Sequence, residues 1–411
     1  MNQTKLIRQT FTFFFFFLLI IVQLPDTATC LKKTQTPIIG VLTQESTSRM
    51  KHYGNQFIAS STVQWLSSAG ARVIPIYYDI NVEVLDEVLD QVNGVVIPSG
   101  GIYLQSHDQE VQHFPLYVTL RKIVEIAKEK TDKGDAFPIF SFGNGMYSLM
   151  KIISQNKAIE EHVEANDLSV DLKVVAKQDA LKKSQLFEAF SSYYIINDDP
   201  ETNSGNAGGD KYDASENQIG SESNLKFWMD QEFAITKKQF QGSQELKNFF
   251  HLLQTTQDRN GKEIVASIEA KNYPFFGIGW MPDKSAWEIM STKKQFCHTQ
   301  DCIVISQNFA HLIVRHAKKN NQKIWSSKEE LKRMIQSTSI FETKQQTDNK
   351  ISECYFFELS PQYGKSDATL FETLTDFFSI LGLTAGLVFF YLGIKIILTS
   401  NAFKNLVKNI K

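Results

Sequence analysis

Short apolar runs alternate with amphipathic segments through residues 36–154, and this alternation constrains the fold more than any other feature. The runs PIIGVL, ARVIPIYY, NGVVIP and FPIFSF each predict a buried strand, because parallel strands covered on both faces are nearly continuous hydrophobic runs. The segments between them place apolar residues at helical spacing. The pattern predicts an α/β fold with a doubly wound, mainly parallel sheet.

Three helices are expected within the alternation, over residues 55–70, 82–92 and 118–130. Further along, residues 305–319 predict a long helix and the charged segment 323–346 predicts another. Residues 197–224 carry seven acids and one lysine, which predicts a disordered surface insertion.

The N-terminus has the pattern of a secretory signal peptide. Lys5 and Arg8 precede an apolar run of twelve residues over 11–22, which is too short to span a bilayer comfortably. Pro25 breaks the run, and small residues precede Cys30. We expect residues 1–30 to be a cleaved signal; an uncleaved signal anchor is the alternative.

A second apolar segment lies near the C-terminus. Residues 377–394 are eighteen residues without a charge, about 27 Å as a helix, which is close to one hydrocarbon core. The lysines beyond it favour the cytoplasmic side. The sequence predicts a transmembrane helix over 374–399, a basic cytoplasmic tail over 400–411 and a luminal or extracellular body over 31–360, as in a single-pass type I membrane protein of the secretory pathway. A buried core helix is the alternative.

Of the four cysteines, Cys30 would leave with the signal. Cys297 and Cys302 are close enough in sequence to pair in an oxidising lumen. Cys354 makes the remaining number odd, so the sequence does not fix the pairing. The net charge of −2, without a basic stripe, argues against nucleic acid as a partner.

The stretch FPIFSFGNGMYSLM, residues 137–150, has the form of a nucleophile elbow: a strand, a sharp glycine-rich turn, then a helix. Small residues are required two positions before and after the nucleophile, because the strained turn leaves no room for side chains. Ser141 and Gly145 meet this requirement, so Gly143 occupies the nucleophile position. Loops after 97, 142 and 280 are expected to meet here, at the carboxyl ends of the parallel strands.

Four segments resemble the folate gamma-glutamyl hydrolases, a peptidase family (C26) with the flavodoxin-like fold of class I glutamine amidotransferases: PIIGVLTQE, YGNQFIASSTVQWLSSAGARVIPI, NGVVIPSGG and YPFFGIGWMPDKSAWE. The resemblance runs from about residue 37 to about residue 357. It implies a Cys nucleophile in G-T-C-x-G, with a His base and an orienting Glu in W-H-P-E-K.

This chain departs from those motifs at the reacting positions. Gly143 stands at the nucleophile position, Met281 at the base position and Asp283 at the position of the orienting acid. Glycine offers no nucleophile and methionine accepts no proton near neutral pH, although the covalent route needs both groups. Loss of either group alone should remove most of the rate.

Other positions implied by the resemblance concern substrate and oxyanion. Tyr147 stands where the family has a Glu, and Asp230–Gln231 where it has a substrate-facing Asn-His pair. An oxyanion hole is expected from the Gly100 loop and the Asn144 backbone N–H; such a hole stabilises an oxyanion but attacks nothing. His107, His113, Ser141 or Ser148 could take over as nucleophile or base only through several coincidences.

We therefore expect a membrane-anchored, catalytically inactive gamma-glutamyl hydrolase homologue whose cleft binds a ligand or partner, with folate polyglutamate or a gamma-glutamyl peptide as candidates. The alternative is an active folate polyglutamate gamma-glutamyl hydrolase (an omega peptidase) with non-standard residues. Glutamine hydrolysis meets the same objection as the family chemistry. No cofactor or metal is expected, and the resemblance allows a homodimer.

Overall fold

The computed structural model describes residues 35–100, 114–157, 160–190, 218–219, 225–289, 296–320 and 327–360. All of them belong to Met1–Ser360, one of two compact units; the other is Pro361–Lys411. The expected signal peptide, transmembrane helix and tail lie outside the described residues, as does the 197–224 insertion apart from Gln218–Ile219. Within the described ranges, no helix is both long and apolar enough to cross a membrane.

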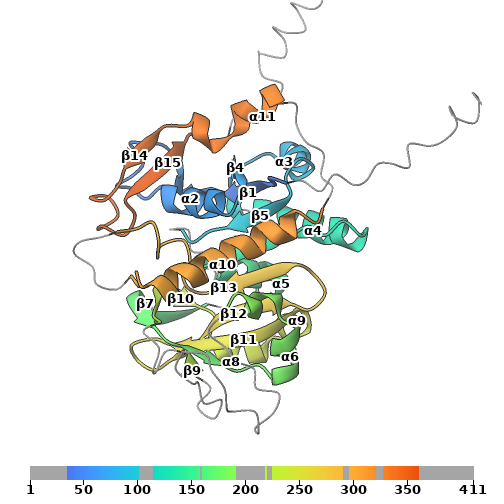
Figure 1. Ribbon diagram of the computed structural model, residues 1–411, viewed down its shortest axis with the longest axis vertical. Coiled ribbons are helices and arrows are strands. Elements are labelled where there is room, and N and C mark those ends of the chain that lie inside the picture. Colours follow the sequence, from blue (N-terminus) through green and yellow to red (C-terminus); the bar gives the residue numbers. More distant parts are fainter. Residues whose placement is uncertain are drawn as a thin grey trace, which may run out of the picture. The chain divides into compact units, whose positions relative to one another are not determined.

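A nine-stranded sheet forms the centre of the described unit (Figure 1). Its first five strands run parallel to one another and the last four continue it in antiparallel fashion. In order across the sheet, the strands are β4 (Arg72–Ile76), β1 (Ile38–Leu42), β5 (Gly94–Ile97), β6 (Ile139–Phe142), β13 (Phe275–Ile278), β12 (Glu263–Ala270), β11 (Phe250–Gln257), β8 (Leu172–Val174) and β9 (Gln218–Ile219).

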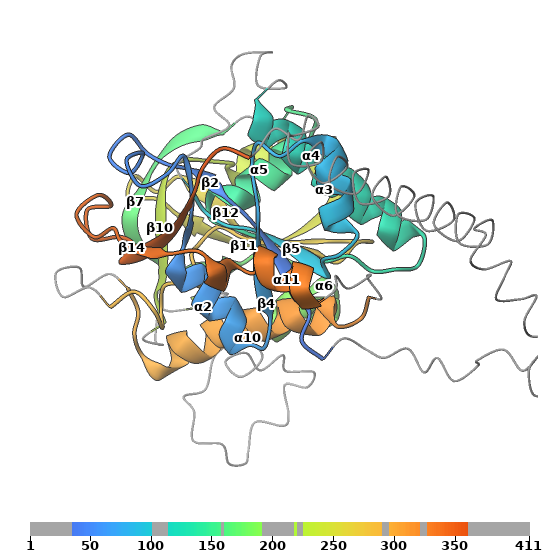
Figure 2. The same ribbon diagram turned by 90° about the horizontal axis from the view of Figure 1, so that it is seen from above.

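Helices cover both faces of the parallel strands, which confirms the doubly wound arrangement (Figure 2). On one face, α2 (Ser60–Ser68) packs on α10 (Gln300–Ala317), and the Trp65 indole N–H donates to the Ser306 carbonyl at 2.8 Å. On the other face lie α3 (Val82–Leu89), α4 (Pro115–Asp132) and α5 (Asn144–Ile153). The core fills both layers, because all five β1 residues and all four residues of β5 and β6 are buried.

Smaller elements flank this frame. A four-stranded sheet has the order β14 (Ile340–Glu342), β15 (Glu353–Phe357), β3 (Gln56–Ala59) and β2 (Gln44–Glu45), and β10 (Phe227–Ala234) pairs with β7 (Glu161–Val170). The remaining helices are α6 (Gln178–Lys183), α7 (Gln185–Glu188), α8 (Lys237–Gly242), α9 (Gln244–Phe249), α11 (Ser327–Arg333) and a 3-10 turn at Ile335–Ser337.

Two expected helices are corrected by this smaller sheet. The helix expected over 55–70 begins only at Ser60, because Gln56–Ala59 form β3 between β15 and β2. The helix expected over 323–346 ends at Arg333, because Ile340–Glu342 pair with β15 as an edge strand. In both places strand pairing outweighs local helix propensity.

Candidate active-site cleft

The elbow has the sharp turn that its sequence predicts. Gly143 leads from β6 into α5 with φ +56° and ψ −131°, a backbone conformation that side chains rarely adopt. Its N–H donates to the Ile278 carbonyl at 2.9 Å, which ties the turn to the end of β13. At Gly145 a Cβ would lie 2.3 Å from the Ile97 carbonyl oxygen, so only glycine fits there.

The space in which a nucleophilic side chain would begin is occupied by Ser99. A Cβ at Gly143 would lie 2.4 Å from Ser99 Oγ and 2.5 Å from Ser99 Cβ. Both distances are far below van der Waals contact. A side chain at Gly143 would therefore overlap Ser99 where it leaves the backbone. Ser99 comes from the PSGG loop after β5, and sequence reasoning did not identify it.

The expected oxyanion donor already has a partner inside the protein. The Asn144 backbone N–H donates to Ser99 Oγ at 3.3 Å, and its side-chain Nδ2 donates to the Gly100 carbonyl at 3.0 Å. A substrate carbonyl oxygen would have to displace the Ser99 hydroxyl to reach this N–H. The two loops of the expected oxyanion hole do meet, but they hydrogen-bond to each other.

At the base position, Met281 lies in the cleft wall and its backbone N–H donates to the Trp228 carbonyl at 3.0 Å. Asp283 is fully buried. Its Oδ2 accepts from the Thr62 hydroxyl at 2.6 Å and lies 3.2 Å from Lys284 Nζ. Its Oδ1 has no hydrogen-bond partner among the described residues. A buried carboxylate thus keeps one oxygen without a partner among the described residues, two positions after Met281.

Lys284 joins this buried group. Its ammonium donates to Ser61 Oγ at 2.7 Å and lies 3.7 Å from Glu288 Oε1. Burial lowers the pKa of Lys284, but the Asp283 and Glu288 carboxylates outweigh this effect and hold the pKa above its usual value. Lys284 therefore stays charged as the counterion of the two acids.

The remaining positions implied by the family divide between core and cleft. Tyr147 is fully buried and its hydroxyl donates to the Val265 carbonyl at 3.0 Å; burial, followed by the Glu160 charge, raises its pKa, so it stays neutral. Gln231 lies near the elbow, with Nε2 3.5 Å from the position of a Cβ at Gly143. This Nε2 donates to the Gly279 carbonyl at 2.6 Å. Asp230 forms an ion pair with Lys350 at 2.6 Å.

The three expected loops meet in one cavity of about 230 Å³. Residues of the β5 loop, the elbow and the β13 loop all line it, which confirms that they converge. The turn over residues 346–351 forms a further wall that sequence reasoning did not predict. The ionic groups in the lining are largely paired with one another, as in the Arg49–Asp348 contact of 2.7 Å. The lining residues used here are Thr62, Ser99, Gly100, Asn144, Met281, Asp283 and Lys350.

The replacement nucleophiles considered from the sequence lie in the core or outside the described residues. Ser141 is buried and its hydroxyl donates to the Phe276 carbonyl at 3.1 Å. Ser148 lies inside α5 and is buried. His107 and His113 lie outside the described residues. Burial raises the pKa of the Cys354 thiol to about 12, so this thiol is unreactive.

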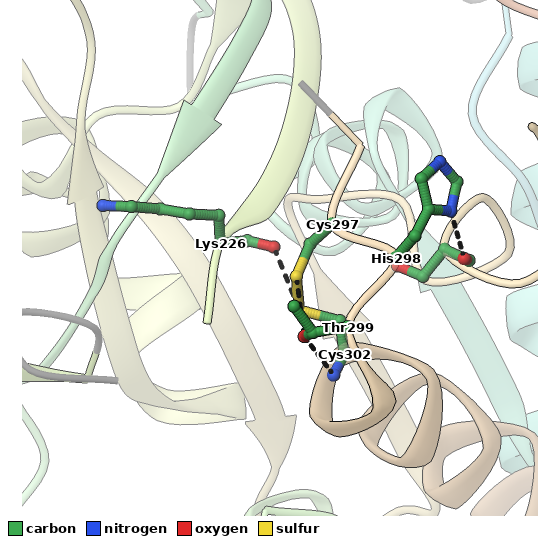
Figure 3. Close-up of a disulfide and its surroundings, with 6 residues drawn as sticks. Lys226, Cys297, His298, Thr299 and Cys302 are labelled. Carbon is green, nitrogen blue, oxygen red and sulfur yellow. Dashed lines mark hydrogen bonds between the residues drawn. A yellow bond between two sulfur atoms is a disulfide. The ribbon is translucent and has the colours of Figure 1, made fainter. Parts of the chain in front are cut away.

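The other two described cysteines form a disulfide, Cys297–Cys302, which the sequence left open as one pairing (Figure 3). Thr299 caps α10 beside it, accepting from the Cys302 N–H at 3.4 Å. Cys302 Sγ lies 3.7 Å from the Lys226 carbonyl oxygen. The bond fixes the start of α10 and leaves no free thiol there. The described residues also contain no group of three or more His, Cys, Asp or Glu side chains placed to hold a metal.

Comparison with known proteins agrees with the resemblance seen in the motifs. The family model for Peptidase C26 matches residues 37–190. Gamma-glutamyl hydrolase of Glycine max is 30% identical over 302 residues, which is 72% of this chain and 77% of that protein. Gamma-glutamyl hydrolase of Homo sapiens is 27% identical, over 78% of this chain and 90% of its own.

Gamma-glutamyl hydrolase B of Dictyostelium discoideum is 26% identical over 335 residues, 81% of this chain and 86% of that protein. Among solved structures, the glutaminase domain of Trypanosoma brucei CTPS matches with a TM-score of 0.40 and 13% identity, over 71% of this chain and 97% of that one.

Proposed function

The chain belongs to the gamma-glutamyl hydrolase family, and we propose that within this family it is a catalytically silent member whose cleft binds a ligand without hydrolysing it. The observation that carries the proposal is the pair Gly143 and Ser99. A glycine at the elbow removes the nucleophile, and a serine side chain occupies the space that a nucleophile would need.

Hydrolysis through a covalent intermediate needs a nucleophile, a base and a free oxyanion donor. Gly143 has no side chain, Met281 has no basic atom, and the Asn144 N–H is bonded to Ser99 Oγ. These are three separate losses, and the effects of catalytic groups that act together are strongly non-additive. Recovery of any one of them would therefore leave the others limiting.

The ligand that family membership favours is a gamma-glutamyl compound, either a folate polyglutamate or a gamma-glutamyl peptide. The cleft is still lined by polar groups from the three loops, which supports binding. Its acidic and basic side chains lie largely in pairs, so a carboxylate ligand would have to compete with Asp348 for Arg49 or with Asp230 for Lys350. We propose moderate rather than tight binding for this reason.

Membrane anchorage and a luminal or extracellular body are part of the proposal. The apolar segment at 377–394 with its basic flank supports the anchor, and the signal-like N-terminus supports entry into the secretory pathway. The Cys297–Cys302 disulfide is consistent with an oxidising compartment, since disulfides persist there and are rare in the cytosol.

The experiment combines binding with turnover on the full-length chain. Titration calorimetry with pteroyl-di-gamma-glutamate measures binding, and glutamate release from the same compound measures hydrolysis. We expect binding without release. A charge-reversed Arg49→Glu variant should weaken binding, and the matched variant Lys238→Glu, an exposed lysine of α8, should leave it unchanged. Glutamate release by the unaltered chain would instead support an active gamma-glutamyl hydrolase with non-standard residues. Absence of any binding would remove the ligand from the proposal.

A further inference from the structure

A large cavity formed by described residues lies at the opposite end of the sheet from the elbow. It has a volume of about 850 Å³, within the range of small-molecule sites. Ala136 and Pro274 line it; Ala136 lies three residues before β6, and Pro274 lies directly before β13. The elbow follows the carboxyl end of β6, so the cavity opens at the amino ends of the same strands. It is a separate site, and nothing in the elbow chemistry requires it.

Its lining carries an excess of positive charge. Four lysines line the cavity against two acids: Lys177, Lys183, Lys271, Lys319, Asp179 and Glu269. The Glu269 carboxylate is already engaged, because it accepts from the Ser184 hydroxyl and from the N–H groups of Gln185 and Leu186, both at 3.1 Å. Its charge is therefore directed at α7 rather than at the lysines.

Three of these lysines have no counterion among the described residues. Within the part of the chain that the structure describes, the ammonium groups of Lys177, Lys183 and Lys319 make no hydrogen bond or ion pair. Most other lysines among the described residues are paired, as in the Lys130–Asp90 contact of 2.7 Å. The whole chain has a net charge of −2, so this concentration of unpaired positive charge is local.

The floor of the cavity is apolar, except for one buried polar atom without a hydrogen-bond partner among the described residues. It is formed by Phe276, four alanines and the His316 ring, whose centroid lies 4.9 Å from that of Phe276. His316 is only 4% exposed, and its Nε2 has no hydrogen-bond partner among the described residues. Burial, then the Lys319 and Arg315 charges, lower its pKa to about 3, so the ring is neutral and its Nε2 can donate or accept. A buried polar atom without a partner costs free energy that a seated ligand would recover.

We propose that this cavity is a second binding site, for an aromatic phosphate ester of nucleotide size. Lysine is a common phosphate ligand and acts as a point charge, which fits several unpaired ammonium groups around one opening. The apolar floor of alanines and Phe276 offers hydrophobic contact to an aromatic ring. The neutral His316 Nε2 supplies one directional hydrogen bond to a polar atom of that ring.

The test uses the full-length chain and 4-methylumbelliferyl phosphate as the probe, measured by titration calorimetry at neutral pH and low salt. Two further ligands separate the contributions: 7-methoxy-4-methylcoumarin has the ring without the charge, and inorganic phosphate has the charge without the ring. Lys183→Gln/Lys319→Gln removes two unpaired charges. Lys238→Gln/Lys328→Gln makes the same change in charge at exposed positions outside the lining.

We expect the aryl phosphate to bind at least about tenfold more tightly than either fragment. The double substitution Lys183→Gln/Lys319→Gln should weaken binding by about three- to tenfold, as expected for two partly solvated charge contacts. The control Lys238→Gln/Lys328→Gln should leave binding unchanged. His316→Phe keeps an aromatic ring on the floor and should weaken the aryl phosphate but not inorganic phosphate.

An equal loss of affinity in the Lys183/Lys319 variant and in the Lys238/Lys328 control would overturn the proposal. The loss would then follow from the change in net charge rather than from a site at this cavity. Equal binding of the neutral coumarin, or no binding of the aryl phosphate, would overturn it as well. The site is distinct from the elbow cleft, so none of these outcomes bears on pteroyl-di-gamma-glutamate binding.

Discussion

Placing a cysteine at Gly143 tests directly whether Ser99 occupies the nucleophile space. Gly143→Cys should destabilise the fold for two separable reasons. The backbone at φ +56° and ψ −131° strains any side chain, at a cost of about 1–3 kcal/mol. The new Cβ would also lie 2.4 Å from Ser99 Oγ, and overpacking of this kind costs a further ~1–3 kcal/mol.

Ser99→Gly should remove only the second cost. The free energy of unfolding, measured by urea titration of the full-length chain, should therefore fall by about 2–6 kcal/mol for Gly143→Cys alone. In the Ser99→Gly background the fall should be about 1–3 kcal/mol. The coupling between the two positions is then about 1–3 kcal/mol in a double-mutant cycle.

Gly70→Cys is the matched control. Gly70 has φ +92° and a Cβ there would meet nothing within 4 Å. It carries the backbone strain without any overlap, so it should show no coupling to Ser99→Gly. Additivity of Gly143→Cys and Ser99→Gly within about 0.5 kcal/mol would refute the reasoning, because the serine would then not occupy the space.

Three further predictions concern groups around the two sites. Asp283→Asn should lower the free energy of unfolding by about 3–5 kcal/mol in urea titration, because Lys284 would lose a buried counterion; an effect below 1 kcal/mol would mean that the pair is solvated. Reduction of Cys297–Cys302, or its replacement by two serines, should cost about 2 kcal/mol because the loop it closes is short, and an unchanged melting temperature after reduction would contradict this. His316 is neutral in the fold with a pKa of about 3, so on acidification the unfolded chain protonates this residue first. The free energy of unfolding should therefore fall as the pH decreases from about 6.5 towards 3. In His316→Phe that fall should be smaller, and identical pH profiles would refute the assignment.

The sequence predicted the elbow well because its determinants are local. Strand, turn and helix are adjacent in the chain, and the small residues at Ser141 and Gly145 are needed by the turn itself. The convergence of the loops after β5, β6 and β13 followed from the parallel sheet. The substitutions at the expected nucleophile and base positions, Gly143 and Met281, stay a prediction from residue types.

What the sequence did not predict depends on contacts between distant segments. Ser99 lies 44 positions before Gly143 in the chain. Only the fold brings its hydroxyl to the backbone N–H of Asn144, the residue after Gly143. β3 was expected as part of a helix because its strand character comes from pairing with β15, which is remote in sequence. Tyr147 was placed with substrate-facing positions, yet helical geometry directs it to the Val265 carbonyl in the core.

The most direct test of the central claim is to restore the chemistry. Gly143→Cys, Ser99→Gly and Met281→His are combined in the full-length chain, and glutamate release from pteroyl-di-gamma-glutamate is compared with that of the unaltered chain. In the matched control, Gly143→Ala replaces Gly143→Cys and the other two changes are kept. The account predicts no release by the unaltered chain or the alanine control, and release by the cysteine variant. Release by the unaltered chain would contradict the account, because the chemistry would then reside in residues other than these.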